Sequence, residues 1–143
     1  EKNMLTTIQI GEMLQDEYIS LHIDQKLGDL VEAIKKSEKN IFAVLDRKGK
    51  FTGIIELNDI KAQLFQPNRF ETVRIQSLMK KPAGILRLNQ DMHSVMEKFD
   101  HTQSWYLPVL DAENRFLGFI SKTKMFNKYR EILASQGGLY EEG

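Results

Sequence analysis

The sequence has no cysteine, only three prolines and one tryptophan among its 143 residues. The absence of cysteine excludes disulfides, thiolate metal sites and cysteine nucleophiles, and it fits a reducing compartment. No apolar run approaches the ~18 residues that a membrane-spanning helix needs. Neither charge is in surplus, because 20 basic residues balance 20 acidic ones. A nucleic acid partner is therefore not expected, since a protein that binds phosphate backbones normally has a basic surface.

The bulk composition is that of a globular protein, with 41% hydrophobic and 28% charged residues. A chain of this length fits one ordinary domain or two very small ones. It opens with Glu1 instead of methionine and closes on a glycine-containing tail after Gly137. We interpret these ends as those of a piece cut from a larger protein.

An internal repeat organises the chain. Both copies contain an apolar-Leu-Asp segment, then a polar turn, then Phe-x-Gly followed by two apolar residues. Asp46 and Asp111 are 65 positions apart (111 − 46), and Gly53 and Gly118 are separated by the same distance (118 − 53). The offset also holds upstream, where it pairs Ile10 with Ile75, Leu21 with Leu86, Gln25 with Gln90 and Glu32 with Glu97. A constant register over such a length indicates a duplication.

Each copy predicts the same order of elements: short strand, helix, strand, strand, helix. We expect Asp24 and Asn89 to cap the first helix of each copy, because both residue types favour that position. Apolar residues at helical spacing follow, namely Leu27, Leu30, Val31 and Ile34, then Met92, Val95, Met96 and Phe99. Strands are predicted at 41–45, 51–55, 106–110 and 116–120, with hairpin turns between them. The fold class is therefore α/β (α+β).

One copy alone is too small to bury a comfortable core. We therefore expect the copies to pack face to face as a pseudo-twofold pair that shares one core, with a cleft between them. Such concave seams are frequent ligand sites. The predicted organisation is a first motif at 8–65, a linker at 66–72, a second motif at 73–132 and a flexible tail at 133–143.

The repeat resembles the CBS motif, named after cystathionine β-synthase, which usually occurs in tandem pairs called Bateman modules. Its signature is glycine, two apolar residues, serine or threonine, two variable residues and aspartate. The first copy reads GIIELND at 53–59, and the second reads GFISKTK at 118–124. The segments LPV at 107–109 and SLMKKP at 77–82 are also typical of the family. The resemblance covers the chain from Ile8 to Ile132.

The segment 99–130 is similar to the second CBS motif in the cytoplasmic tails of bacterial chloride channels. The stretches that carry this similarity are WYLPV at 105–109, GFISK at 118–122 and MFNKYR at 125–130. The resemblance implies a regulatory cytoplasmic domain of an inner-membrane protein, with a homodimeric partner and the transmembrane domain of the parent channel. CBS pairs also regulate other transporters, kinases and dehydrogenases, so those parents remain alternatives.

The family also implies a nucleotide site, in which the signature aspartate accepts hydrogen bonds from ribose hydroxyls and the hydroxyl residue donates to phosphate. This chain divides that pair between its copies. The first copy has Asp59 but Glu56 in the hydroxyl position, and the second has Ser121 but Lys124 in the aspartate position. The possible ligands are AMP, ADP and ATP. We place the site in the second copy, with Ile85, Leu107 and Pro108 around the base and Ser121 and Lys124 towards the phosphate.

The alternative is that Asp59 and Ser121 only cap helices and that the chain is a structural dimerisation module. No catalytic site is predicted, because the sequence has no nucleophile paired with a base and no glycine-rich phosphate loop. No metal site is predicted either, because the three histidines are not at ligand spacing. Trp105 is expected to pack in the seam between the copies.

Overall fold

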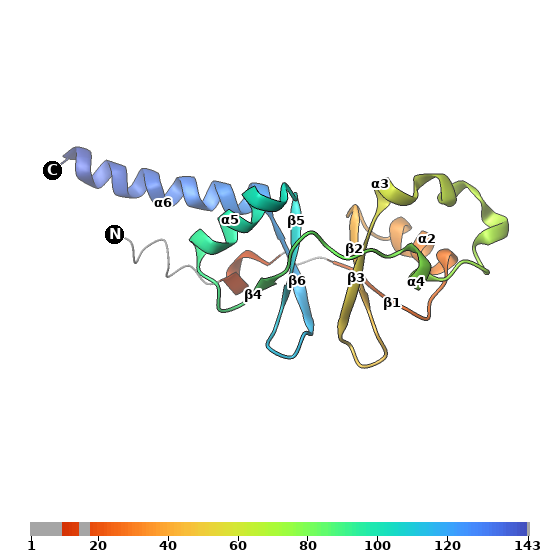
Figure 1. The fold of residues 1–143 in the computed structure, drawn as a ribbon. Coiled ribbons are helices and arrows are strands. Elements are labelled where there is room, and N and C mark those ends of the chain that lie inside the picture. The colour runs from red at the N-terminus through yellow and green to blue at the C-terminus, as the bar shows by residue number, and fades with distance from the viewer. Residues whose placement is uncertain (1–9, 15–17, 143) are drawn as a thin grey trace. The chain divides into compact units, whose positions relative to one another are not determined.

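The computed structural model describes residues 10–14 and 18–142, with side chains described as far as residue 135. Residues 8, 9 and 15–17 of the predicted first motif lie outside the described residues. The described chain forms two three-stranded sheets with strand orders β1-β2-β3 and β4-β5-β6 (Figure 1). The first copy contains η1 (Ile10–Met13), β1 (Ser20–His22), α2 (Leu27–Lys35), β2 (Ile41–Leu45), β3 (Phe51–Glu56), α3 (Leu57–Ile60) and η2 (Lys61–Phe65). The second contains α4 (Ile75–Leu78), β4 (Leu86–Arg87), α5 (Met92–Thr102), β5 (Tyr106–Leu110), β6 (Phe116–Ser121) and α6 (Lys122–Glu142), and η3 (Pro67–Arg69) lies between the copies. The predicted element order and mixed α+β class are confirmed.

The first sheet combines one parallel and one antiparallel pair of strands. β1 runs parallel to β2, and β2 runs antiparallel to β3 with a bulge between Val44 and Leu45. Four successive residues of β2, from Ile41 to Val44, are buried. Burial of successive residues means that both faces of this central strand are covered, which explains why its sequence is uniformly apolar instead of alternating.

The sequence repeat is reproduced in individual hydrogen bonds. Oδ1 of Asp46 accepts from the backbone N–H groups two and four residues ahead, at 2.8 and 2.9 Å, and Oδ1 of Asp111 does the same at the same distances. Oε1 of Gln25 and of Gln90 each accepts from the N–H three residues earlier, at 2.8 Å. These side chains stabilise the turns of both copies, because each side-chain oxygen accepts hydrogen bonds from backbone N–H groups within the turn.

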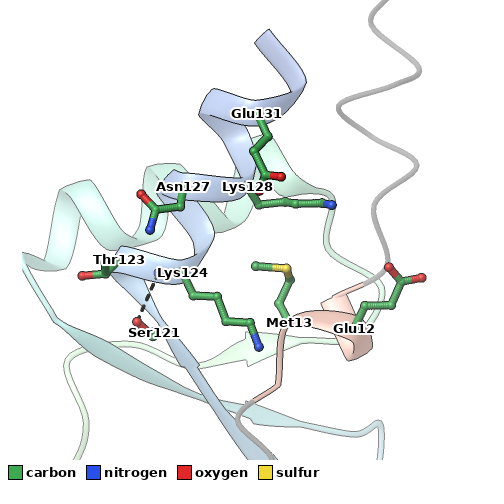
Figure 2. A pocket seen from close by; sticks show the side chains of 8 residues that line it. All are labelled: Glu12, Met13, Ser121, Thr123, Lys124, Asn127, Lys128 and Glu131. Carbon is green, nitrogen blue, oxygen red and sulfur yellow. Dashed lines mark hydrogen bonds between the residues drawn. The ribbon is translucent and has the colours of Figure 1, made fainter. Parts of the chain in front are cut away.

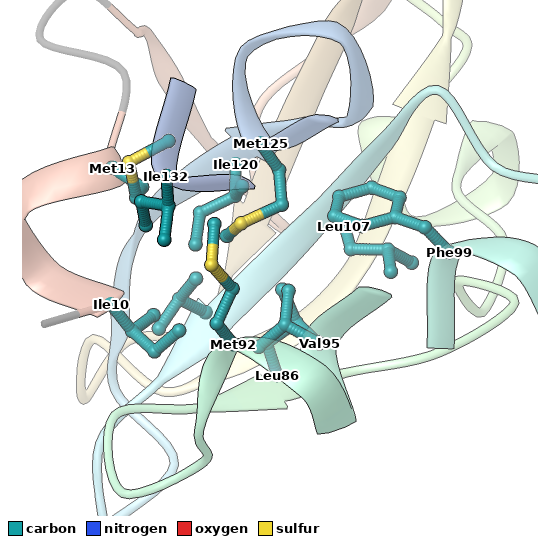
Figure 3. Packing of buried hydrophobic residues seen from close by; sticks show 11 residues of the cluster. Ile10, Met13, Leu86, Met92, Val95, Phe99, Leu107, Ile120, Met125 and Ile132 are labelled. Atoms are coloured by element: carbon teal, nitrogen blue, oxygen red, sulfur yellow. The ribbon is translucent and has the colours of Figure 1, made fainter. Parts of the chain in front are cut away.

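The described residues divide into two compact units, each with its own hydrophobic cluster, in place of the single shared core that was expected. The C-terminal unit comprises 10–14, 83–109 and 117–142, and the N-terminal unit comprises 18–82 and 110–116. In the C-terminal unit, side chains from η1, β4, α5, β5, β6 and α6 point towards one another (Figure 3). The cluster of the N-terminal unit is formed by Leu21, Leu27, Leu30, Ala33, Phe42, Val44, Ile55, Ile60 and Ile75.

The opening element of each copy packs in the core of the other copy. Ile10 and Met13 of η1 are buried in the cluster that otherwise belongs to the second copy. Ile75 of α4, which is the repeat counterpart of Ile10, is fully buried in the cluster of the first copy. Neither unit is therefore a contiguous copy of the repeat.

The helix caps differ from the predicted ones. Helix α2 begins at Leu27, and Asp24 instead pairs its carboxylate with Arg47, whose Nε lies 2.7 Å from Oδ2. Helix α5 is capped by Asp91, which accepts from the N–H of Ser94 at 2.8 Å. Both predicted caps were wrong because each helix begins two residues later than expected. Those residues belong to a turn in which the glutamine side chain, Gln25 or Gln90, accepts a hydrogen bond from a backbone N–H.

Helix α6 continues through the predicted tail as far as Glu142. None of the helices within the described residues combines the length and apolar character required to cross a bilayer.

Candidate functional site

The site begins at the junction between β6 and α6. Ser121, the last residue of β6, is buried at 9% exposure, and its Oγ accepts a hydrogen bond of 3.2 Å from the backbone N–H of Lys124. This is a helix N-cap, so the predicted capping role of Ser121 is confirmed. A serine hydroxyl has one proton to donate and a second lone pair. Capping therefore leaves the Ser121 hydroxyl able to donate to a ligand, and the two predicted roles are compatible.

A cavity of about 490 Å³ lies beside this junction, between α6 and η1 (Figure 2). Its volume is in the range of pockets that bind small molecules. The residues that line it are Glu12, Met13, Ser121, Thr123, Lys124, Asn127, Lys128 and Glu131. All of them belong to the C-terminal unit, and η1 reaches this position only because it packs with the second copy.

Two lysines give the cavity its cationic part. Lys124 and Lys128 are one helical turn apart, and both side chains extend from α6 towards the side on which η1 lies (Figure 2). Within the part of the chain that the structure describes, no carboxylate forms an ion pair with either amine. Glu12 and Glu131 also line the cavity, so its wall carries two groups of each sign. The positive end of the α6 dipole adds to the field near Ser121.

The corresponding part of the N-terminal unit is neutralised internally. Nζ of Lys80 lies 2.6 Å from Asp59 and 3.4 Å from Glu56. The backbone of Lys80 is fixed by two reciprocal hydrogen bonds of 2.8 Å with Ile54 of β3. The hydrogen bond that Lys80 donates to Asp59 raises the pKa of Lys80 above its usual value, against the opposing effect of partial burial. The N-terminal unit thus pairs Lys80 with its carboxylates, whereas the C-terminal unit leaves two lysines facing a cavity.

The predicted alternative role of Asp59 as a helix cap is wrong. Asp59 lies inside α3, whose N-cap is Glu56, and neither side chain makes a capping hydrogen bond. Its carboxylate instead binds Lys80. A sequence pattern could not distinguish these roles, since the partner comes from a segment 21 residues further along (80 − 59).

The three residues predicted to surround a base do not line the cavity. Leu107 is buried in the hydrophobic cluster of the C-terminal unit. Pro108, the next residue of β5, is also buried and points to the opposite face of the strand, and Ile85 is half-buried just before β4. Of the predicted site residues, the structure therefore brings together Ser121 and Lys124, while Asp59 belongs to the other unit.

Several residues that line the candidate site were not predicted. Lys128 could have been found from its spacing to Lys124, because residues four apart share one face of a helix. Glu12 and Met13 could not have been found in this way, because their position depends on the exchange of opening elements between the copies.

Trp105 was predicted to pack in a seam, but it is 67% exposed, with the Lys122 ammonium 5.2 Å from its ring centre. Among the described side chains, at 10–14 and 18–135, no three His, Asp or Glu residues gather in a group that could hold a metal ion.

A duplicated strand-helix-hairpin-helix unit, with a cavity at the start of its last helix, defines a paired-repeat module. The chain belongs to the CBS domain family, because the family model for the CBS domain matches it twice, at residues 10–65 and 75–131. The resemblance inferred from the repeat is thereby confirmed at the level of the family. No curated protein gives a significant match to the sequence.

Solved structures of CBS pairs share the fold. A CBS domain-containing protein of unknown function from Bacillus anthracis str. Ames Ancestor matches with a TM-score of 0.80 at 16% identity, over 92% of this chain and 99% of that one. CbpB in complex with c-di-AMP matches with a TM-score of 0.76 at 14% identity, over 97% and 95% of the two chains. The CBS domain of the bacterial CNNM/CorC family Mg²⁺ transporter in complex with ATP matches with a TM-score of 0.73 at 13% identity, over 87% and 89%. At these identities the similarity concerns the fold.

Proposed function

We propose that this CBS pair is a regulatory module that binds an adenine nucleotide in the cavity beside α6 and thereby modulates a membrane transporter. The observation that carries the proposal is the pair of lysines, Lys124 and Lys128, facing that cavity without an ion-pair partner among the described residues. Two unpaired ammonium groups beside a serine hydroxyl and a helix N-terminus favour a phosphate-bearing ligand. The CBS-pair structures that are named as complexes with ATP and with c-di-AMP support the same class of ligand.

The proposed parent is a chloride channel or a related ion transporter. This part of the proposal rests on the similarity of 99–130 to chloride channel tails and on the occurrence of the same fold in a Mg²⁺ transporter. In this setting the module is the cytoplasmic domain of an inner-membrane protein, contacts the transmembrane domain and forms a homodimer. Ligand binding would shift the population of conformations of the module, because a ligand stabilises the state that it binds better.

A second candidate is a structural dimerisation module that binds no ligand. The observation that favours it is the neutralised signature of the first copy, whose Asp59 and Glu56 are already paired with Lys80.

Thermal melting separates the two candidates. The protein is melted alone and with AMP, ADP, ATP or S-adenosylmethionine up to millimolar concentration. A ligand at 100 times its dissociation constant adds about 2.7 kcal/mol to the free energy of unfolding, so its melting temperature rises visibly. We expect such a shift with at least one adenine nucleotide. If none of the four compounds moves the transition, the structural candidate holds and the nucleotide proposal fails.

A further inference from the structure

The side chains around the cavity determine which part of a nucleotide they recognise. Lys124 and Lys128 are four residues apart on α6, so their side chains leave the same face of the helix in successive turns. One phosphate group at the start of α6 would contact one amine. The two ammonium groups end at separate places along the cavity (Figure 2), so two successive phosphates of one chain could each contact one of them.

The backbone at the start of α6 contributes less than usual to anion binding. The N–H of Lys124, one of the free donors of the first helical turn, is already taken by Oγ of Ser121 at 3.2 Å. Recognition of an anion therefore depends more on the two side-chain amines than on the helix terminus. The affinity of a ligand should follow the number of amines that its phosphates engage.

The carboxylates of the cavity set the direction of the ligand. Glu131 lies in the turn after Lys128, and Glu12 lies on η1 across from α6 (Figure 2). Both would repel a phosphate and accept hydrogen bonds from hydroxyl or amino groups. The uncharged part of a nucleotide is thus directed to the carboxylates, and its phosphates to the lysines.

We infer that the cavity selects nucleotides by the length of their phosphate chain, and that it binds di- and triphosphates in preference to monophosphates through Lys124 and Lys128 together. This inference rests on the proposed nucleotide function and adds the ligand class to it. Lys124 is exposed and Lys128 is half-buried, so contact of either amine with a phosphate is expected to change affinity by roughly fivefold.

Isothermal titration calorimetry of the whole chain with AMP, ADP and ATP, without divalent cations and at one ionic strength, tests the inference. ADP and ATP should bind at least about fivefold more tightly than AMP. Lys128→Gln should reduce that preference to less than about twofold, while Lys48→Gln, which removes an exposed lysine of the N-terminal unit, should leave it unchanged. Circular dichroism checks that both variants remain folded.

The possible failures are distinguishable. If AMP, ADP and ATP bind with affinities within a factor of about two, or if Lys128→Gln weakens all three equally, the selectivity inference is overturned and the nucleotide function stands. If none of the three binds to the wild-type protein, the proposed function and the inference fail together.

Discussion

Replacing Gly53 by alanine should destabilise the N-terminal unit through a single added methyl group. Gly53 is the glycine of the CBS signature in β3, and it is buried. A Cβ at this position would lie 2.8 Å from the backbone oxygen of Lys80 and 3.3 Å from Sδ of Met79. The methionine side chain can move, but the Lys80 oxygen cannot, because it accepts a hydrogen bond of 2.8 Å from the N–H of Ile54.

The expected cost follows from these contacts. Overpacking of a well-packed site costs about 1–3 kcal/mol. If the two backbone segments moved apart to make room, the two hydrogen bonds between Ile54 and Lys80 would also weaken, and each is worth about 1 kcal/mol. We therefore expect Gly53→Ala to lower the free energy of unfolding by about 2–4 kcal/mol, a large part of the stability of a small domain.

Urea denaturation followed by far-UV circular dichroism measures this change. Gly11→Ala is the matched control, because the nearest atom to its added Cβ is 3.9 Å away. It should change the free energy of unfolding by less than about 0.5 kcal/mol. Gly49→Ala separates steric contact from backbone strain, because Gly49 has φ +80° and no atom within 4 Å, which predicts a loss of about 1–2 kcal/mol. A Gly53→Ala protein as stable as the wild type would refute the close approach of Lys80 to β3.

Three further predictions concern single side chains. Ser121→Ala removes the cap of α6 and should lower the free energy of unfolding of the ligand-free protein by about 1 kcal/mol in urea; an unchanged value would contradict the capping bond. The pKa of Asp111 lies below its usual 3.8 in the folded protein, chiefly because the backbone N–H of Arg115 donates to its carboxylate. The stability that this carboxylate contributes is therefore complete above the pKa of the unfolded chain and is lost as the pH falls through the pKa of the folded state. Asp111→Asn should therefore flatten the decline of the melting temperature below about pH 4, and an equally steep decline in both proteins would count against this. Phe99→Ala should cost about 3–5 kcal/mol in urea because Phe99 is fully buried, whereas Trp105→Ala, at an exposed position, should cost less than about 0.5 kcal/mol; similar losses would contradict the assigned burial.

The sequence predicted the fold where the signal was local and occurred twice. The strands β2 and β5 have the predicted bounds, because uniform apolar runs between polar turns leave little choice. The turns were predicted for a related reason, since Asp46 and Asp111 each follow an apolar strand and accept the same two hydrogen bonds. In such segments local preference and tertiary packing agree.

The parts that the sequence did not predict depend on contacts between distant segments. The apolar pattern showed that Ile10 and Ile75 are equivalent, but not that each is buried with the other copy. The same limit applies to the site. Ser121 and Lys124 were identified from the signature. Asp59 pairs with Lys80, which is distant in the sequence and meets Asp59 only through the tertiary fold, so no local pattern could predict this contact.

The placement of η1 and α4 has a consequence for how such a protein can evolve. A deletion that removed either copy would also remove the residues that complete the core of the surviving one: Ile75 for the first copy, or Ile10 and Met13 for the second. Once this arrangement existed, loss of one half was no longer a neutral step, and the two halves could only be inherited together. The copies were then free to diverge in their polar residues, as the equivalent residues Asp59 and Lys124 have, provided that these few apolar positions stayed filled.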